Sequence, residues 1–314
     1  MTNFQAFCLF PRMSRSDRRN SRALSRRRRV LPALLLFLLL SVLACMPAEA
    51  AAYKPVVKNE TVKIKGLKST SKILFVTDMH IIANNDSAIT KKTRSTYKSR
   101  LKQMTFSYGT TGKGWLRLAS KLDSYNADLI IFGGDMIDYC SKANLKLFQQ
   151  GLNKIQTPYI VLYGNHETYK WAQGDSKKKV ASVIADSEIY SESTVITREM
   201  PGFHLLCLND KETKVSEATV TQTRAKLKKW GTKKPVIVFT HVPVVCGEHA
   251  NSDNAHALTS LLFAKTSPVK AVFTGHVHHY QILYYRKGLN QVSLLPAYAQ
   301  YITMVTVTGT GSDN

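Results

Sequence analysis

The chain has 314 residues, of which 44% are hydrophobic and 21% are charged. This is the composition of a globular protein, with enough apolar side chains to bury one or two cores, and it excludes an intrinsically disordered chain. The formal net charge of +23 favours anionic partners, including nucleic acid and membrane surfaces, but no nucleic-acid motif accompanies it.

The first fifty residues differ in composition from the rest of the chain. They contain nine arginines and no lysine, and a basic stretch that ends in four arginines precedes the apolar run 30–46. The small residues Ala48 and Ala50 follow, an order typical of a signal peptide that is cleaved before Ala51. The apolar run has the shortest length that spans a bilayer, and Cys45 resembles a lipoprotein site, so an uncleaved anchor and a lipoprotein are the alternatives. We therefore expect an exported protein that is extracellular, periplasmic or anchored at the outer side of a membrane.

We divide the chain into three parts. Residues 1–50 form the signal peptide or N-terminal anchor, residues 51–70 form a linker with a leading strand at 61–65, and residues 71–314 form a single domain. Signal cleavage would leave three widely spaced cysteines, which are no disulfide framework. We predict that Cys207 is a buried core residue, while a single bridge between Cys140 and Cys246 stays open.

After residue 70, short β-branched apolar runs alternate with longer amphipathic stretches. This pattern predicts an α/β domain in which helices cover a sheet. The runs that we predict as buried strands are 73–77, 129–134, 159–164, 236–240 and 271–275. The stretches that we predict as helices are 115–125, 142–155, 223–230 and 256–264. Trp115 and Trp230 are assigned to packing because the apolar spacing in their helices is that of a core-facing stripe.

Residues that can bind a metal ion follow each of the five predicted strands. In chain order these are Asp78 and His80, Asp135, Asn165 and His166, His241, and His276 and His278. Ligands bind beyond the carboxyl ends of strands in open α/β sheets, so we expect these side chains to converge. A single histidine beside an apolar run is usually a core residue. Here potential ligands follow all five runs, so a purely structural role would have to be assumed separately for each of the five. The mixture of carboxylate, imidazole and amide suits Mn, Fe or Zn rather than a structural cysteine site or a calcium loop.

These segments read DMH, GDMID, GNHE, THVP and GHVH, and in this order the chain closely resembles the calcineurin-like metallophosphoesterases over about residues 71–310. The resemblance implies a sandwich of two mixed β-sheets flanked by helices. It also implies a metal-dependent hydrolase of phosphate monoesters or diesters. The family pattern places one metal ion on Asp78, His80 and His278, a second on Asn165, His241 and His276, and Asp135 between them.

Physical chemistry supports that division of the ligands. Two divalent ions roughly 3.5 to 4 Å apart repel each other and need an anionic bridge, which Asp135 and a shared hydroxide provide. The two charges also lower the pKa of bound water, so a metal-bridging hydroxide is the expected nucleophile and no covalent phosphoenzyme is required.

His166 occupies the GNHE position that faces the leaving group in family members, which implies a catalytic role rather than metal binding. Asp138 stands where related phosphatases carry an Asp that hydrogen-bonds this histidine and favours its protonated form, as a general acid requires. The structural alternative is that Asp138 caps the helix that begins at Lys142. Purple acid phosphatases carry a metal-binding Tyr at the position of Asp138, so we expect no tyrosinate colour.

A basic stretch, residues 84–114, separates the first motif from the helix at Trp115. We consider two interpretations, a solvated loop and a lid over an anionic substrate. Its cationic residues include Lys91, Lys92, Arg94, Lys98, Arg100 and Lys102. His249 and His256 are expected at the surface. A noncatalytic binding module would be expected to have lost ligands, whereas this chain keeps all of them, so we favour an enzyme; monoesters, cyclic nucleotides, lipids and nucleic acids stay open as substrates.

Overall fold

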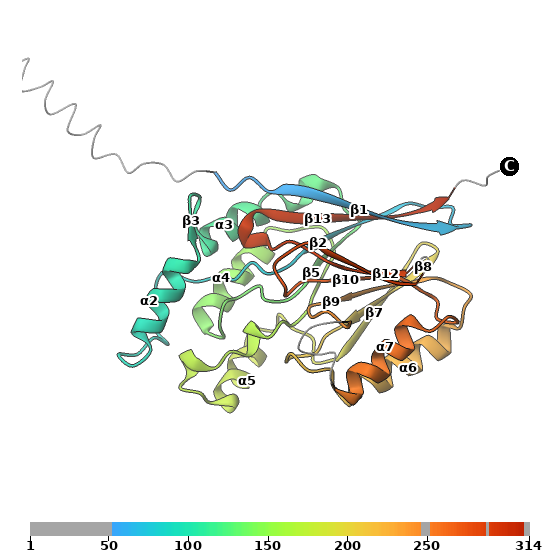
Figure 1. The fold of residues 1–314 in the computed structure, drawn as a ribbon. Helices are drawn as coiled ribbons and strands as arrows, with labels where there is room; N and C mark the ends of the chain where they lie inside the picture. The colour runs from blue at the N-terminus through green and yellow to red at the C-terminus, as the bar shows by residue number, and fades with distance from the viewer. Residues whose placement is uncertain (1–51, 246–251, 287–288, 311–314) are drawn as a thin grey trace, which may run out of the picture. The chain divides into compact units, whose positions relative to one another are not determined.

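A computed structural model of the chain describes residues 52–245, 252–286 and 289–310 (Figure 1). The predicted signal sequence, including Cys45 and the cleavage site, lies outside the described residues, as do Cys246 and His249. Among the described residues, none of the helices combines the length and the apolar character needed to cross a bilayer.

The first sheet is mixed and has five strands in the spatial order β1-β13-β2-β5-β6. The bounds of these strands are β1 Val56–Lys65, β2 Ser71–Val76, β5 Leu129–Phe132, β6 Tyr159–Val161 and β13 Tyr301–Thr310. β1 runs parallel to β13, β13 runs antiparallel to β2, and β2, β5 and β6 are parallel. The leading strand that we predicted at 61–65 is therefore part of a longer strand at the edge of this sheet.

The second sheet is also mixed and has six strands in the order β11-β12-β10-β9-β8-β7. Their bounds are β7 Val195–Met200, β8 Phe203–Leu208, β9 Val236–Thr240, β10 Val269–Thr274, β11 Gln281–Arg286 and β12 Leu289–Ser293. The four inner strands are parallel, and the two outer strands pair antiparallel with their neighbours. The five predicted strands are thus β2, β5, β6, β9 and β10.

Six α-helices are present in the described residues. They are α2 Arg94–Gln103, α3 Thr111–Ala119, α4 Lys142–Leu152, α5 Lys177–Ala185, α6 Glu217–Trp230 and α7 Asp253–Phe263. The smaller elements are the hairpin β3 Thr105–Phe106 and β4 Gly109–Thr110, and the 3-10 turns η1 Leu122–Tyr125, η2 His166–Thr168, η3 Trp171–Gln173 and η4 Ala297–Ala299. The last five α-helices begin after a Ser or Thr whose hydroxyl accepts a backbone N–H, which stabilises the first turn. All four predicted helices are present, while α2 and α5 were not predicted.

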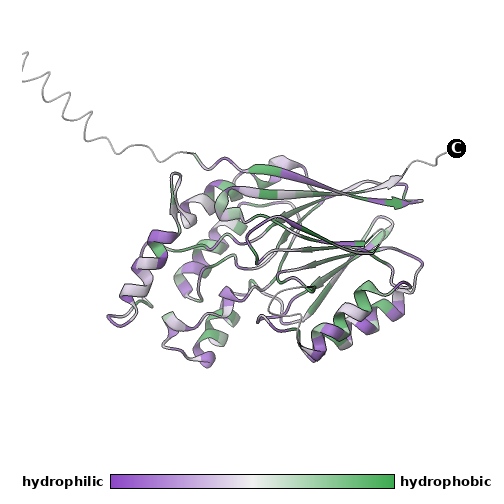
Figure 2. Cartoon of the chain, in the orientation of Figure 1, coloured by the Kyte–Doolittle hydropathy of each residue, from purple (hydrophilic) through white to green (hydrophobic). Residues whose placement is uncertain are grey.

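Successive side chains of a strand point to opposite faces, and this alternation builds separate cores. Ile73 and Phe75 of β2 pack between the two sheets with Phe239 of β9, while Leu74 and Val76 pack on the other face with α3, α4 and α5. Helices α6 and α7 cover the outer face of the second sheet. Hydrophobic residues accordingly run along the central strands of both sheets (Figure 2). The predicted sandwich of two mixed sheets flanked by helices is confirmed.

The predicted packing residues lie in these cores. Trp115 is fully buried, and its indole N–H donates to the carbonyl groups of Leu147 and Phe148. Trp230 is partly buried and stacks on His204 with ring centroids 4.3 Å apart. The thiol of Cys207 is buried between the sheets, and Cys140 and Cys207 are both free and buried.

Candidate metal centre

The five motif segments leave β2, β5, β6, β9 and β10 at their carboxyl ends and meet in one place. Five of the predicted ligands have a left-handed backbone there: Asp78 (φ 55°), His80 (48°), Asp135 (49°), His276 (68°) and His278 (57°). This conformation costs non-glycine residues on the order of 1–3 kcal/mol each and persists only where neighbouring structure enforces it. Here the segments hold one another, because the N–H of Asp78 donates to the Gly134 carbonyl (3.0 Å) and the N–H of His80 donates to the Asp135 carbonyl (2.9 Å).

One group of donor atoms comes from Asp78, His80, Asp135 and His278, whose nearest atoms all lie within 4.8 Å of one another. The Nε2 atoms of His80 and His278 are 3.2 Å apart, and His278 Nε2 is 3.1 Å from Asp78 Oδ1. On the far side of each ring, His80 Nδ1 is 3.2 Å from the Asp138 carboxylate and His278 Nδ1 is 3.3 Å from the Tyr298 hydroxyl. With these partners on Nδ1, both rings can turn a lone pair on Nε2 toward a shared cation.

A second group comes from Asp135, His241 and His276, also within 4.8 Å of one another. The carbonyl of Gly133 lies 2.8 Å from His241 Nδ1 and accepts its proton. His241 Nε2 is buried and has no hydrogen-bond partner, and the same is true of Asn165 Oδ1. Two buried polar atoms without a hydrogen-bond partner fit a metal-binding site. Asp135 contributes most to raising the pKa of His241 to about 10 against the effect of burial, so a cation is favoured here, and a bound metal would displace the proton.

Asp135 belongs to both groups. Its Oδ2 lies 3.3 Å from His241 Nε2, 3.8 Å from His80 Nε2 and 3.9 Å from His166 Nε2, and its Oδ1 accepts the backbone N–H of His166 at 2.8 Å. Burial would raise the pKa of this carboxyl, but the surrounding histidines hold it well below its usual range. The donor set fits two metal ions that share Asp135. The structure therefore brings together six of the seven residues predicted as ligands, and the seventh, Asn165, directly precedes His166, whose N–H donates to Asp135.

Glu167, which we did not predict, holds Asp135 in position. Its fully buried carboxylate accepts the N–H groups of Gly164 (2.7 Å), Met136 (2.8 Å) and Asp135 (2.9 Å). Burial first, and then the Asp135 carboxylate, raise the pKa of Glu167 to about 7 despite these donors. Gly164 is needed for a separate reason, since a Cβ there would lie 2.2 Å from Asp135 Oδ1. The acidic fourth letter of GNHE was the only sequence signal for Glu167.

The predicted hydrogen bond between the Asp138 carboxylate and His166 is wrong. His166 Nδ1 lies 2.7 Å from the main-chain carbonyl oxygen of Asp138 and 3.7 Å from its carboxylate. The carboxylate instead binds His80 Nδ1 and the guanidinium of Arg100, whose Nε donates at 2.9 Å. Burial lowers the pKa of His166. Burial also acts to lower the pKa of His80, but the carboxylates of Asp138, Asp135 and Asp78 outweigh it and raise that pKa. Ser141 caps α4, so the alternative role for Asp138 as a cap is also wrong.

Arg100 reaches the centre from the basic stretch 84–114. That stretch is not an open loop, since it contains α2 and the β3–β4 hairpin. Arg100 is partly buried against Asp138, and the other five cationic residues that we named there are exposed. His256 is exposed on α7, as expected.

The chain resembles known proteins in sequence and in structure. The profile of the calcineurin-like phosphoesterases matches residues 71–280. A probable glycerophosphodiester phosphodiesterase, GpdQ, of Arcobacter nitrofigilis is 25% identical over 183 residues, which are 54% of this chain and 64% of that protein. A probable cyclic nucleotide phosphodiesterase of Ruthia magnifica is 24% identical over 169 residues, 52% of this chain and 67% of that protein. The crystal structure of a dimetal phosphatase from Danio rerio has a TM-score of 0.45 and 16% identity, over 73% of this chain and 88% of that one. The chain thus spans less than two thirds of the length of the first of these relatives.

Proposed function

Because the chain belongs to the calcineurin-like phosphoesterase family, we propose that it is a metal-dependent hydrolase of phosphate esters, and of diesters in particular. One observation carries the proposal: Asp135 lies in both groups of donor atoms, beside the buried and unpartnered His241 Nε2. The preference for diesters is supported by the two relatives, which are both named as phosphodiesterases.

Each residue of the centre has a part in this proposal. Asp78, His80 and His278 would hold one ion, Asn165, His241 and His276 would hold the other, and the Asp135 carboxylate would offset the repulsion between them. When bound, the ions supply Lewis acidity toward the phosphate oxygens and activate water. Hydrolysis joins the water oxygen to phosphorus and breaks the bond to the leaving oxygen, which departs as an alcohol after it gains a proton.

His166 is the residue that we assign to this proton. The Asp138 carbonyl lies 2.7 Å from His166 Nδ1 and can accept only from a protonated nitrogen, so Nδ1 keeps its proton in both charge states. The proton that is gained and lost is then on Nε2, the ring atom that is 3.9 Å from Asp135 Oδ2 and faces the centre. Asp138 is a positioning residue, since its carbonyl orients His166 and its carboxylate orients His80.

The metal requirement can be tested with two histidine variants. His241→Ala should lose about half of the bound metal and all diesterase activity, because its Nε2 belongs to only one donor group. His256→Ala, an exposed histidine on α7, should keep both. Elemental analysis after reconstitution with Mn, Zn or Fe, together with hydrolysis of bis(para-nitrophenyl) phosphate, checks this. The proposal would be refuted if the wild-type protein bound none of the three metals. It would also be refuted if His241→Ala kept its full metal content.

The role of His166 is tested by His166→Gln. Metal content should survive, and kcat for an alkyl ester should fall by roughly 10²- to 10⁴-fold, the usual contribution of a general acid. A para-nitrophenyl ester should be affected less, because that leaving group needs no proton. Loss of metal, or an equal decrease for both esters, would show that His166 is a ligand or a phosphate-binding group instead.

Export is a separate proposal. It is supported by the order of basic, apolar and small residues within 1–50. Mass spectrometry of the exported protein should find a first residue at Ala51. An intact segment would instead establish the anchor, and a lipid on Cys45 would establish the lipoprotein.

A further inference from the structure

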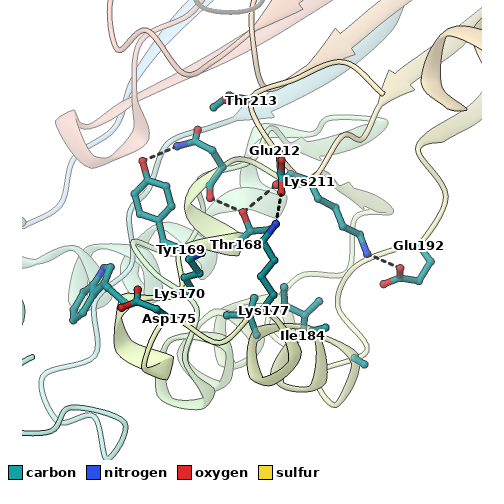
Figure 3. A pocket seen from close by; sticks show the side chains of 15 residues that line it. Thr168, Tyr169, Lys170, Asp175, Lys177, Ile184, Glu192, Lys211, Glu212 and Thr213 are labelled. Carbon is teal, nitrogen blue, oxygen red and sulfur yellow. Dashed lines mark hydrogen bonds and ion pairs between the residues drawn. The ribbon is translucent and has the colours of Figure 1, made fainter. Parts of the chain in front are cut away.

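A pocket of about 850 Å³ opens beside the metal centre and shares Asn165 with it (Figure 3). Its walls come from the segment after β6, from α5 and from the loop at residues 211–213. Pockets of roughly 300–1,000 Å³ are the usual size for small organic ligands. The pocket is therefore large enough for an organic group attached to a phosphate at the metals.

Tyr169 joins the pocket to the catalytic groups. Its hydroxyl accepts a hydrogen bond from Asn165 Nδ2 at 3.0 Å, and its ring centroid is 4.0 Å from that of His166. Tyr169 also lines the pocket and is 41% exposed, which is unusual for a large aromatic residue in this chain. His166 is the residue assigned to the leaving oxygen, so the group attached to that oxygen would extend along Tyr169 into the pocket.

The lining of the pocket combines apolar residues with charged residues of both signs, and we call the charged residues its rim. Val180, Ala181, Ile184 and Ala185 of α5 provide the apolar surface. The rim carries three basic and three acidic residues, namely Lys170, Lys177 and Lys211 with Asp175, Glu192 and Glu212. Two opposite pairs lie close together, Lys211 with Glu192 (2.5 Å) and Lys177 with Glu212 (3.9 Å). The rim therefore gives no net attraction to an anionic group.

A second groove differs from this pocket in its charge. It has a volume of about 810 Å³, lies between α2 and α4, and presents Arg94, Lys98, Lys142 and Lys146 against the single acid Asp86. None of the seven candidate metal ligands lines this cationic groove. The groove that would attract a polyanion is thus separate from the metal centre, while the pocket that borders the centre is neutral.

We infer that the neutral pocket binds the alcohol group of the ester, and that this group is uncharged and has an aromatic or aliphatic face. The inference rests on the proposed function. It makes the residues of α5 the determinants of substrate choice and excludes polyanionic esters, such as nucleic acid, as preferred substrates of this centre.

Phosphonates allow a test that needs no turnover, because their carbon–phosphorus bond is not hydrolysed and only the organic group varies. Calorimetric binding to metal-loaded protein should show phenylphosphonate binding roughly tenfold more tightly than methylphosphonate, as expected when part of one ring is buried. The anionic 2-carboxyethylphosphonate should bind no more tightly than methylphosphonate.

Two matched variants locate the effect. Ala181→Trp fills the neutral pocket from the exposed surface of α5 and should bring the phenyl-to-methyl ratio close to one without changing methylphosphonate binding. Ala143→Trp fills the cationic groove and should leave the ratio at tenfold. Ala185→Trp replaces the first variant if Ala181→Trp does not fold.

The outcomes separate this inference from the proposed function. If no phosphonate binds metal-loaded protein, the proposed function fails and the pocket assignment fails with it. If methylphosphonate binds but phenylphosphonate binds no better, only the pocket assignment is overturned. A phenyl preference that survives Ala181→Trp or Ala185→Trp, or that Ala143→Trp abolishes, would also overturn it.

Discussion

Replacing Glu167 by Gln should loosen the turn that presents Asp135 without altering a candidate metal ligand. One carboxylate oxygen of Glu167 accepts the N–H groups of Asp135 and Gly164. The other accepts those of Met136 and Ile137 together with the Tyr190 hydroxyl. Gln has nearly the same shape, but one of its two terminal atoms is a donor. Whichever way the amide is turned, two buried N–H groups face an NH₂ group.

The cost follows from those two N–H groups. A buried donor left without an acceptor costs about 1–3 kcal/mol, so Glu167→Gln should lower the free energy of unfolding by about 2–6 kcal/mol. Tyr190→Phe is the matched control, because it removes one donor to the same carboxylate and leaves every backbone N–H satisfied. It should cost only about 0.5–1.5 kcal/mol, the net value of one ordinary hydrogen bond.

Urea unfolding in the presence of a chelator measures this effect, because metal binding then adds nothing to stability. A metal titration of the folded variant should also show weaker binding, since Asp135 has lost its support. The prediction is wrong if the free energy of unfolding of Glu167→Gln lies within about 1 kcal/mol of the wild-type value, or if Glu167→Gln lowers it no more than Tyr190→Phe does. Glu167 would then not hold the turn.

Three further outcomes are expected. Asp135→Asn should lower metal content more than His80→Ala, because only Asp135 belongs to both donor groups, and equal losses in elemental analysis would contradict the shared position. Arg100→Met should lower the free energy of unfolding by about 1–3 kcal/mol, since it removes the guanidinium group that binds the buried Asp138 carboxylate, whereas Lys98→Met on the exposed side of α2 should change it by at most about 0.5 kcal/mol. Burial raises the pKa of the Cys140 and Cys207 thiols to about 12, so both should resist iodoacetamide at pH 8 until the protein unfolds, and mass spectrometry that finds either one alkylated in folded protein would contradict their burial.

The sequence predicted the parts of the fold that are buried on both faces. Strands such as β5 and β9 are continuous apolar runs because helices cover one side and the other sheet covers the opposite side. The edge strand β7, Val195–Met200, is buried only at its two ends and gives no such run. Helix α2 has no buried residue at all, so its sequence contains no apolar stripe to detect. An element that is buried on one face only, or on none, lacks the continuous apolar run or apolar stripe by which a strand or helix is recognised in the sequence.

The site shows the same division. The seven candidate ligands could be found because each follows an apolar run directly. Arg100 and Tyr169 could not, because their contacts with Asp138 and Asn165 depend on how α2 and the segment after β6 lie in space. The Asp138 error has the same origin: the partner of its carboxylate, Arg100, is 38 residues away in the chain and belongs to a helix that the sequence did not reveal.

The backbone at the centre supports the view that these positions were selected for their side chains. Glycine would occupy a left-handed conformation without strain, yet Asp78, Asp135 and His278 stand at such positions. Each non-glycine residue there costs on the order of 1–3 kcal/mol, which a chain selected for stability alone would avoid. Glycine is found instead at Gly164, where the carboxylate of Asp135 needs the space. Five of the nine left-handed non-glycine residues in the described part of the chain are thus candidate ligands gathered at one site, a concentration that argues for metal binding independently of any resemblance.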